Sequence, residues 1–89
     1  MTKSEFLKLK NFWIKNLKLR DWNISVKLIL PQKGCDDAGV NFITQTLRES
    51  DIIIFLYDDT TDFDIEVTLV HELLHCYHTT SGMSKDSAE

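Results

Sequence analysis

The sequence predicts an α+β fold, because helical and strand periodicities occupy different parts of its 89 residues. Both ends carry apolar residues at helical spacing, whereas the middle holds short apolar or alternating runs separated by polar turns. The expected architecture is an N-terminal and a C-terminal helix on one face of a small, mostly antiparallel sheet of three strands. A chain of this length buries one modest core, so we expect a single domain over residues 1–89.

Residues 2–19 have the pattern of an amphipathic helix. Thr2 and Glu5 have the spacing of a capping box, in which each side chain bonds the other residue's backbone N–H. Apolar residues recur every three or four positions, opposite a face rich in lysine. The apolar stripe consists of Phe6, Leu9, Trp13 and Leu17. This pattern indicates a helix that packs one face on the core.

Three strands are expected next. Residues 22–30 place apolar side chains, Leu30 included, at every second position, and this stretch ends at Pro31. Residues 40–47 are rich in β-branched and aromatic residues, and residues 48–51 form a polar turn short enough for a hairpin. Residues 52–57 are a continuous apolar run, which favours a central position in the sheet.

The second expected helix covers residues 64–78 and follows an acidic loop, in which Thr61 or Asp62 is the expected N-cap. Apolar residues cover most of its circumference and leave one narrow polar stripe. That stripe contains all three histidines of the chain, His71, His75 and His78. A stripe that only faces solvent would more often carry Lys, Gln or Ser, so metal binding is the favoured interpretation.

Residues 71–75 read His-Glu-Leu-Leu-His and fit the H-E-x-x-H pattern at every fixed position. Residues four apart on a helix share a face, so His71 and His75 can reach one metal ion. Glu72 lies about 100° around the helix, where it can act on a water molecule. Because imidazole nitrogens suit Zn²⁺, the motif predicts zinc ligands at His71 and His75 and a catalytic general base at Glu72.

Catalytic zinc usually has three protein ligands, so a third is needed. Glu89 is the expected one. A helix break at Gly82, followed by a return helix over residues 84–89, would bring Glu89 back to the level of His75.

Two other residues are alternatives for the third ligand. Asp86 has a shorter reach than Glu89. His78 shares the polar face but lies about 10 Å along the helix axis from His71, which is far for one ion on a straight helix. A ligand supplied by a partner is a further alternative.

Charge is distributed unevenly along the chain, whose net charge is −4. Residues 1–33 hold eight basic and two acidic side chains, whereas residues 34–89 hold two basic and twelve acidic ones. The acidic second half disfavours direct binding of nucleic acid there. No run approaches the roughly 18 apolar residues of a membrane span, and the N-terminus lacks the layout of a signal peptide. Cytoplasmic residence is therefore expected.

The order of elements and the stretch 66–75 resemble the small intracellular zincin-like metallopeptidases of phages, prophages and other mobile elements. These are similar in layout to the ImmA/IrrE-like and SprT-like groups. The resemblance covers residues 20–78 and is most specific over residues 67–75. It implies zinc binding by the two motif histidines, catalysis by the motif glutamate, a third ligand from a following helix, and a protein or peptide substrate. A domain truncated before that third-ligand helix, with a site that is weak, empty or completed by a partner, is therefore the alternative to a site completed by Glu89.

Two other interpretations remain open. In one, the chain is a catalytically inactive zincin-like protein that binds or inhibits a partner through its acidic surface. Mimicry of nucleic acid is one form of this, through Asp36, Asp37, Asp58, Asp59, Asp62 and Asp64. In the other, the chain is a structural domain whose histidine stripe binds no metal.

Overall fold

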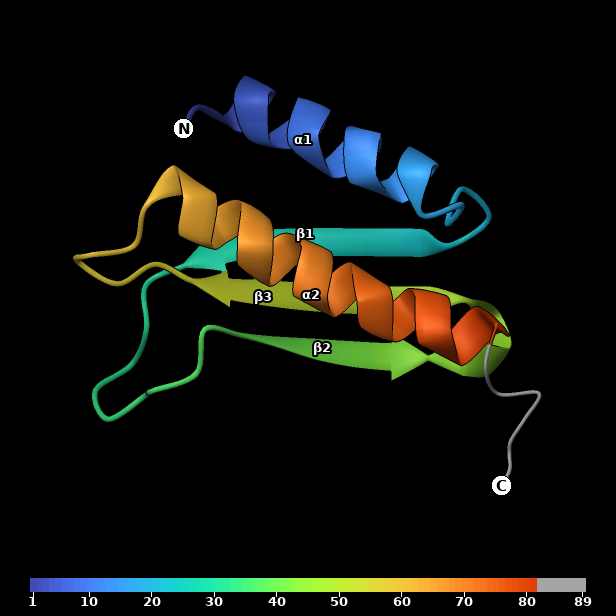
Figure 1. The fold of residues 1–89 in the computed structure, drawn as a ribbon. Helices are drawn as coiled ribbons and strands as arrows, with labels where there is room; N and C mark the ends of the chain where they lie inside the picture. Colours follow the sequence, from blue (N-terminus) through green and yellow to red (C-terminus); the bar gives the residue numbers. More distant parts are fainter. Residues whose placement is uncertain (82–89) are drawn as a thin grey trace.

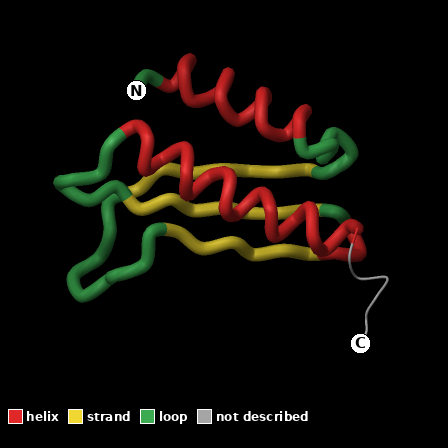
Figure 2. The backbone as a smooth tube through the Cα atoms, viewed as in Figure 1, coloured by secondary structure: helices red, strands yellow, loops and turns green. Residues whose placement is uncertain are grey.

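The computed structural model describes residues 1–81 and consists of two helices packed on a three-stranded sheet (Figure 1). In chain order the elements are α1 (Lys3–Asn16), β1 (Asn23–Ile29), β2 (Gly39–Thr44), the 3-10 turn η1 (Gln45–Leu47), β3 (Glu49–Phe55) and α2 (Asp62–Ser81). Both helices lie on the same face of the sheet (Figures 1 and 2), so the predicted α+β architecture is confirmed. Within these residues, neither helix has the length and hydrophobicity of a membrane span.

The sheet is mixed, so the prediction of a mostly antiparallel sheet was wrong. Its strand order is β1-β3-β2, with β3 antiparallel to β2 and parallel to β1. The hairpin between the second and third strands and the central place of the third are confirmed. The predicted turn over residues 48–51 was wrong, because the turn covers residues 45–48 and residues 49–51 belong to β3. The parallel pair follows from that central place. Since β2 runs opposite to β1 and the hairpin reverses the chain again, β3 lies beside β1 in the same direction.

The buried core lies between the sheet and the two helices. Ile24 of β1 and Ile52 and Ile54 of β3 point towards the helices, and α2 contributes Leu69 and Leu73, which are fully buried. The remaining core side chains are Phe6, Leu19, Trp22, Ile65 and Cys76. Leu30, which the alternation assigned to the inner face, lies beyond the end of β1 and is 78% exposed, so that assignment was wrong.

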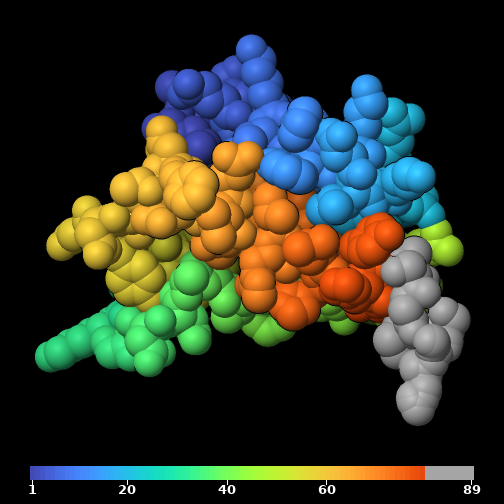
Figure 3. All heavy atoms as spheres, in the orientation of Figure 1, coloured from blue at the N-terminus to red at the C-terminus, as the bar shows by residue number. Residues whose placement is uncertain are grey.

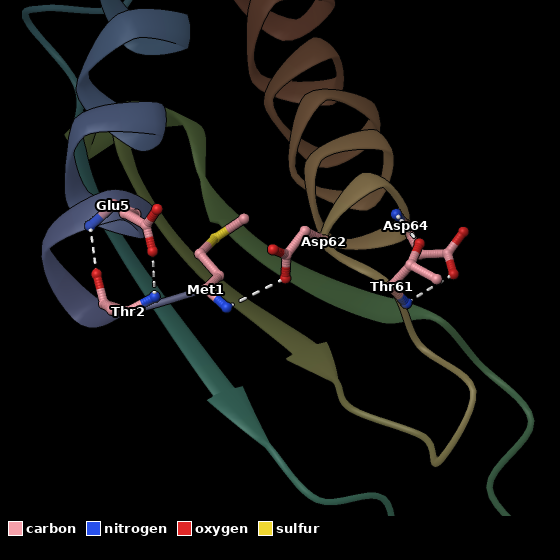
Figure 4. Close-up of polar contacts among 6 residues, drawn as sticks. All are labelled: Met1, Thr2, Glu5, Thr61, Asp62 and Asp64. Atoms are coloured by element: carbon pink, nitrogen blue, oxygen red, sulfur yellow. Dashed lines mark hydrogen bonds and ion pairs between the residues drawn. The ribbon is translucent and has the colours of Figure 1, made fainter.

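Each helix begins with a reciprocal cap (Figure 4). Thr2 Oγ1 accepts the Glu5 N–H at 3.1 Å, and Glu5 Oε1 accepts the Thr2 N–H at 2.8 Å. Thr61 and Asp64 exchange the same pair of bonds at the start of α2, at 3.1 and 3.0 Å. The N-terminal amine pairs with Asp62 at 3.3 Å and so joins the starts of the two helices. The capping box at Thr2 is confirmed, and Thr61 is the N-cap of α2.

The first helix ends at Asn16, earlier than the predicted residue 19. Lys18 has a φ of 59°, in the left-handed region. The Leu19 N–H bonds the Ile14 carbonyl at 2.9 Å and the Lys18 N–H bonds the Lys15 carbonyl at 3.1 Å, which is the pattern of a Schellman motif. Glycine usually occupies the left-handed position of this motif, so no residue type in the sequence marked the end of this helix.

Candidate metal centre on α2

The H-E-x-x-H motif lies in the C-terminal half of α2. The helix packs against β2 and β3 beneath it and against α1 at its side (Figure 1). Leu69, Leu73 and Cys76 recur every three or four residues and have no exposed surface, which fixes the rotation of the helix about its axis. His71 and His75 are consequently turned to the surface, and both are exposed.

The two motif histidines converge. Their Nε2 atoms are 3.2 Å apart, and their rings are perpendicular with centroids separated by 4.8 Å. Two Zn–N bonds of about 2.0–2.1 Å at a tetrahedral angle place their nitrogens about 3.3 Å apart. The observed separation therefore fits a single ion held by both rings. At this distance one ring can also donate a hydrogen bond to the other, depending on the tautomer.

Glu72 is buried on the side of α2 that faces β2, with 7% of its surface exposed. Within the described part of the chain, its carboxylate makes no hydrogen bond or ion pair. Burying a carboxylate without a partner is costly, so such a group is more often found where a ligand or a reacting water binds. This makes Glu72 the strongest candidate for a functional carboxylate in residues 1–79.

A cleft of about 640 Å³ runs between β2 and α2. Residues 39–43 of β2 form one wall, and the other wall contains Glu72, His75, His78 and Thr79. A volume of this size is typical of ligand-binding clefts. The cleft places the buried carboxylate and one of the converging imidazoles beside the edge strand of the sheet.

Gly39 allows α2 to approach β2 closely. A Cβ atom at this position would lie 2.8 Å from the Ile53 carbonyl oxygen and 3.0 Å from Thr68 Cγ2. The first distance is shorter than real carbon contacts and the second is tighter than most, so a larger residue requires the Ile53 carbonyl, and to a lesser degree the Thr68 methyl, to shift. The close packing of β2 against Thr68 of α2 is therefore favoured by the absence of a side chain at Gly39.

The other predicted ligands do not complete a three-residue set in the described chain. Among residues 1–79, no three His, Cys, Asp or Glu side chains are grouped so as to hold a metal ion, His78 included. His78 is exposed, lines the cleft, and lies edge-on to Tyr77 at 5.8 Å between centroids. Glu89, Asp86 and the expected helix over residues 84–89 lie outside the described residues.

The opposite side of the helix is apolar. His71 borders a groove of about 450 Å³ between α1 and α2. Its other lining residues are Trp13, Phe63, Glu66, Val67, Val70 and Leu74. Trp13 Nε1 donates a hydrogen bond to Glu66 Oε2 at 2.8 Å and so links the two helices across this groove.

Sequence reasoning missed Asn41, which lies on β2 at a register position facing the core. Its side-chain amide donates to the Glu72 backbone carbonyl at 2.9 Å and contacts Cys76 Sγ at 3.7 Å. Its oxygen accepts the Ser50 hydroxyl at 2.5 Å. The available signal was an amide residue at an inward position of an otherwise apolar strand, where a polar side chain needs a partner.

No protein-family model, curated protein or solved structure matches this chain. Its function is therefore inferred from the chemistry and geometry of the site.

Proposed function

We propose that this chain is a zinc-dependent metallopeptidase of the zincin-like type found in phages and other mobile elements. In this proposal His71 and His75 hold the metal ion and Glu72 is the general base. One observation carries it: the two imidazoles converge to 3.2 Å, and His75 shares a cleft with the buried carboxylate of Glu72, which lacks a partner in the described chain. Glu89 is the proposed third ligand, with Asp86 as its substitute.

The proposed reaction is hydrolysis of a peptide bond. Zinc, when bound, supplies a Lewis acid that polarises the peptide carbonyl and activates water for attack. Glu72 takes a proton from that water molecule while the oxygen of the water bonds to the carbonyl carbon of the peptide. The same carboxyl then returns the proton to the nitrogen as the C–N bond breaks. The burial of Glu72 supports this role, because the electrostatic interaction of a carboxylate with the reacting groups is stronger where bulk water is excluded.

The cleft supports a peptide as the substrate. β2 is an edge strand, and an edge strand offers unpaired backbone groups to an extended peptide. Residues 39–43 of this strand line the same cleft as Glu72 and His75. A peptide lying along β2 would therefore bring a backbone carbonyl next to the proposed catalytic groups.

The first experiment measures zinc in protein purified without chelator, and zinc affinity by calorimetry. We expect close to one zinc ion per chain. Replacing His71 or His75 by Ala should weaken binding by at least about 100-fold, since loss of a ligand exceeds the loss of a supporting contact. His78→Ala, on the same helix, is the matched control and should leave the affinity unchanged. Protein that binds no zinc would refute the proposal.

A second candidate function is a non-catalytic binding protein that acts through an acidic surface. Asp36, Asp37, Asp58 and Asp59 are all exposed on two loops that lie at the same end of the sheet (Figure 1). The Tyr57 hydroxyl joins the loops by donating to the Asp37 carbonyl at 2.5 Å. A hydrogen bond with Cys35, then desolvation and nearby negative charge, raises the pKa of Tyr57 to about 12.

One pair of variants separates the two functions. Glu72→Gln removes the proposed base and should abolish hydrolysis. Replacing the four loop aspartates by Asn leaves the cleft intact but removes the acidic surface. An effect on a partner that survives the first change and is lost with the second would favour the binding protein, and the reverse pattern would favour the peptidase.

A further inference from the structure

A small polar network links the edge strand to the backbone of the motif. The Ser50 hydroxyl of β3 donates to Asn41 Oδ1 at 2.5 Å, and Asn41 Nδ2 donates to the Glu72 carbonyl at 2.9 Å. The same amide nitrogen lies 3.7 Å from Cys76 Sγ. Ser50 and Cys76 have 1% and 0% of their surface exposed, so the network lies inside the molecule.

The location of this network is specific. Asn41 pairs with Ile52 in the sheet register, which places its side chain on the inner face under α2. Nearer the start of α2, the helix contacts β2 only by packing, where Gly39 leaves room for Thr68. At the level of Glu72, the contact is instead a directional hydrogen bond to the backbone of the motif residue itself.

Burial alone does not explain a polar contact here. An apolar pair in place of two hydrogen-bonded side chains can be nearly neutral for stability, because both desolvation penalties disappear together. A hydrogen bond differs from apolar packing in fixing distance and direction. The network is therefore suited to holding the Glu72 segment of α2 at a set position relative to β2.

We propose that Asn41 is a positioning residue for Glu72. It contacts neither the metal-binding nitrogens nor the carboxylate in the hydrogen bonds of the described chain, and it acts through the Glu72 carbonyl. It fixes the distance between the proposed general base and the edge strand along which the peptide would lie. This inference rests on the proposed peptidase function and adds a residue that sets the geometry of its base.

The test replaces the network by an apolar pair. Asn41→Leu with Ser50→Ala removes both polar partners at once, so the fold and the zinc affinity should be retained. We expect kcat to fall by about 10- to 100-fold with little change in KM, since misplacing a catalytic group by about 1 Å can cost 100-fold. Ile54→Val, a buried substitution on the same strand as Ser50 that lies outside both the network and the cleft, is the matched control and should keep kcat.

If the double variant does not fold, Ser50→Ala alone replaces it. That change frees Asn41 Oδ1 only, and kcat should fall by about two- to tenfold, the range that one neutral hydrogen bond is worth. Zinc binding equal to that of the wild type together with an unchanged kcat, in whichever variant folds, would overturn the positioning role while leaving the peptidase function standing.

A second measurement does not depend on hydrolysis. Residue-resolved amide hydrogen exchange should show faster exchange in the double variant over residues 72–76, by about tenfold, with residues 65–69 unchanged. If the wild type neither binds zinc nor cleaves peptides, the proposed function fails, and this local pattern alone decides whether Asn41 holds the segment. If the double variant and the wild type exchange at the same rates over residues 72–76 as well as over residues 65–69, the inference is overturned.

Discussion

The two sides of α2 differ in chemistry although they belong to one helix. On the β2 side lie the buried carboxylate of Glu72 and the amide of Asn41 beneath it. On the α1 side lies an apolar groove, where Phe63 is 72% exposed and Trp13 bonds Glu66. In the space-filling view, α2 forms a continuous band between α1 (blue) and the β2 region (green) (Figure 3).

This difference separates two uses of a carboxylate. Glu66 and Glu72 are both on α2, and each faces one side of it. The Glu66 carboxylate accepts a hydrogen bond that ties the two helices together, whereas that of Glu72 has no partner in the described chain. The first arrangement stabilises a fold, and the second leaves a group available for chemistry.

The largest expected effect comes from exchanging these two carboxylates for amides. Glu72→Gln should lower kcat for peptide hydrolysis by about 100- to 10,000-fold, the range for loss of a general base, while zinc stays bound. Glu66→Gln is the same substitution on the opposite side, and its oxygen can still accept from Trp13. It should retain the wild-type rate. Equal loss in both variants would mean that the two sides of α2 do not differ in function.

The second prediction concerns the buried core residues that hold both sides of α2 in place. Leu73 is fully buried between them, so Leu73→Ala should lower the free energy of unfolding by about 2–5 kcal/mol. Val67 lies on the α1 side and is half exposed, so Val67→Ala should change the free energy of unfolding by no more than about 0.5 kcal/mol. Chemical denaturation measures both. A large cost for Val67 would show that the apolar groove is part of the core.

The sequence predicts the local parts of this site well. His71 and His75 lie one helical turn apart, so their shared face follows from helix geometry alone. The cap at Thr61 and the central place of the apolar run 52–57 likewise follow from residue types close together in the chain. Each of these features depends on neighbours within a few positions, and each of these expectations matches the structure.

The remaining features depend on contacts between distant residues. The parallel pairing of β1 with β3 depends on which side of β1 the hairpin occupies. The burial of Glu72 depends on the direction in which α2 faces the sheet, and its contact with Asn41 joins positions 31 apart in the chain. Periodicity gives the face of a helix that is apolar, but not which strand lies under each side of it.

The third prediction adds a side chain to β2 where the strand lies against α2. Gly39→Ala should cost about 1–3 kcal/mol of stability and weaken hydrolysis, because the new methyl group must displace Thr68 or the Ile53 carbonyl. Adding Thr68→Ala removes one of the two clashing groups and should restore part of both losses. A double variant that recovers nothing would show that the clash lies within the sheet and that Gly39 does not set the position of α2.

The smallest effect should come from the cap of α2, which lies before both sides begin. Thr61→Ala removes one of the two reciprocal bonds with Asp64 and leaves a backbone N–H of the first turn without that acceptor. We expect the free energy of unfolding to fall by about 1 kcal/mol, with Thr61→Ser, which keeps the hydroxyl, close to the wild type. Zinc affinity and kcat, measured well below the unfolding temperature, should be unchanged, because Leu69 and Leu73 hold the motif in place from the core. A lower zinc affinity in Thr61→Ala protein that is still fully folded would show that the start of α2 is coupled to the histidine pair. The position of the motif would then not depend on core packing alone.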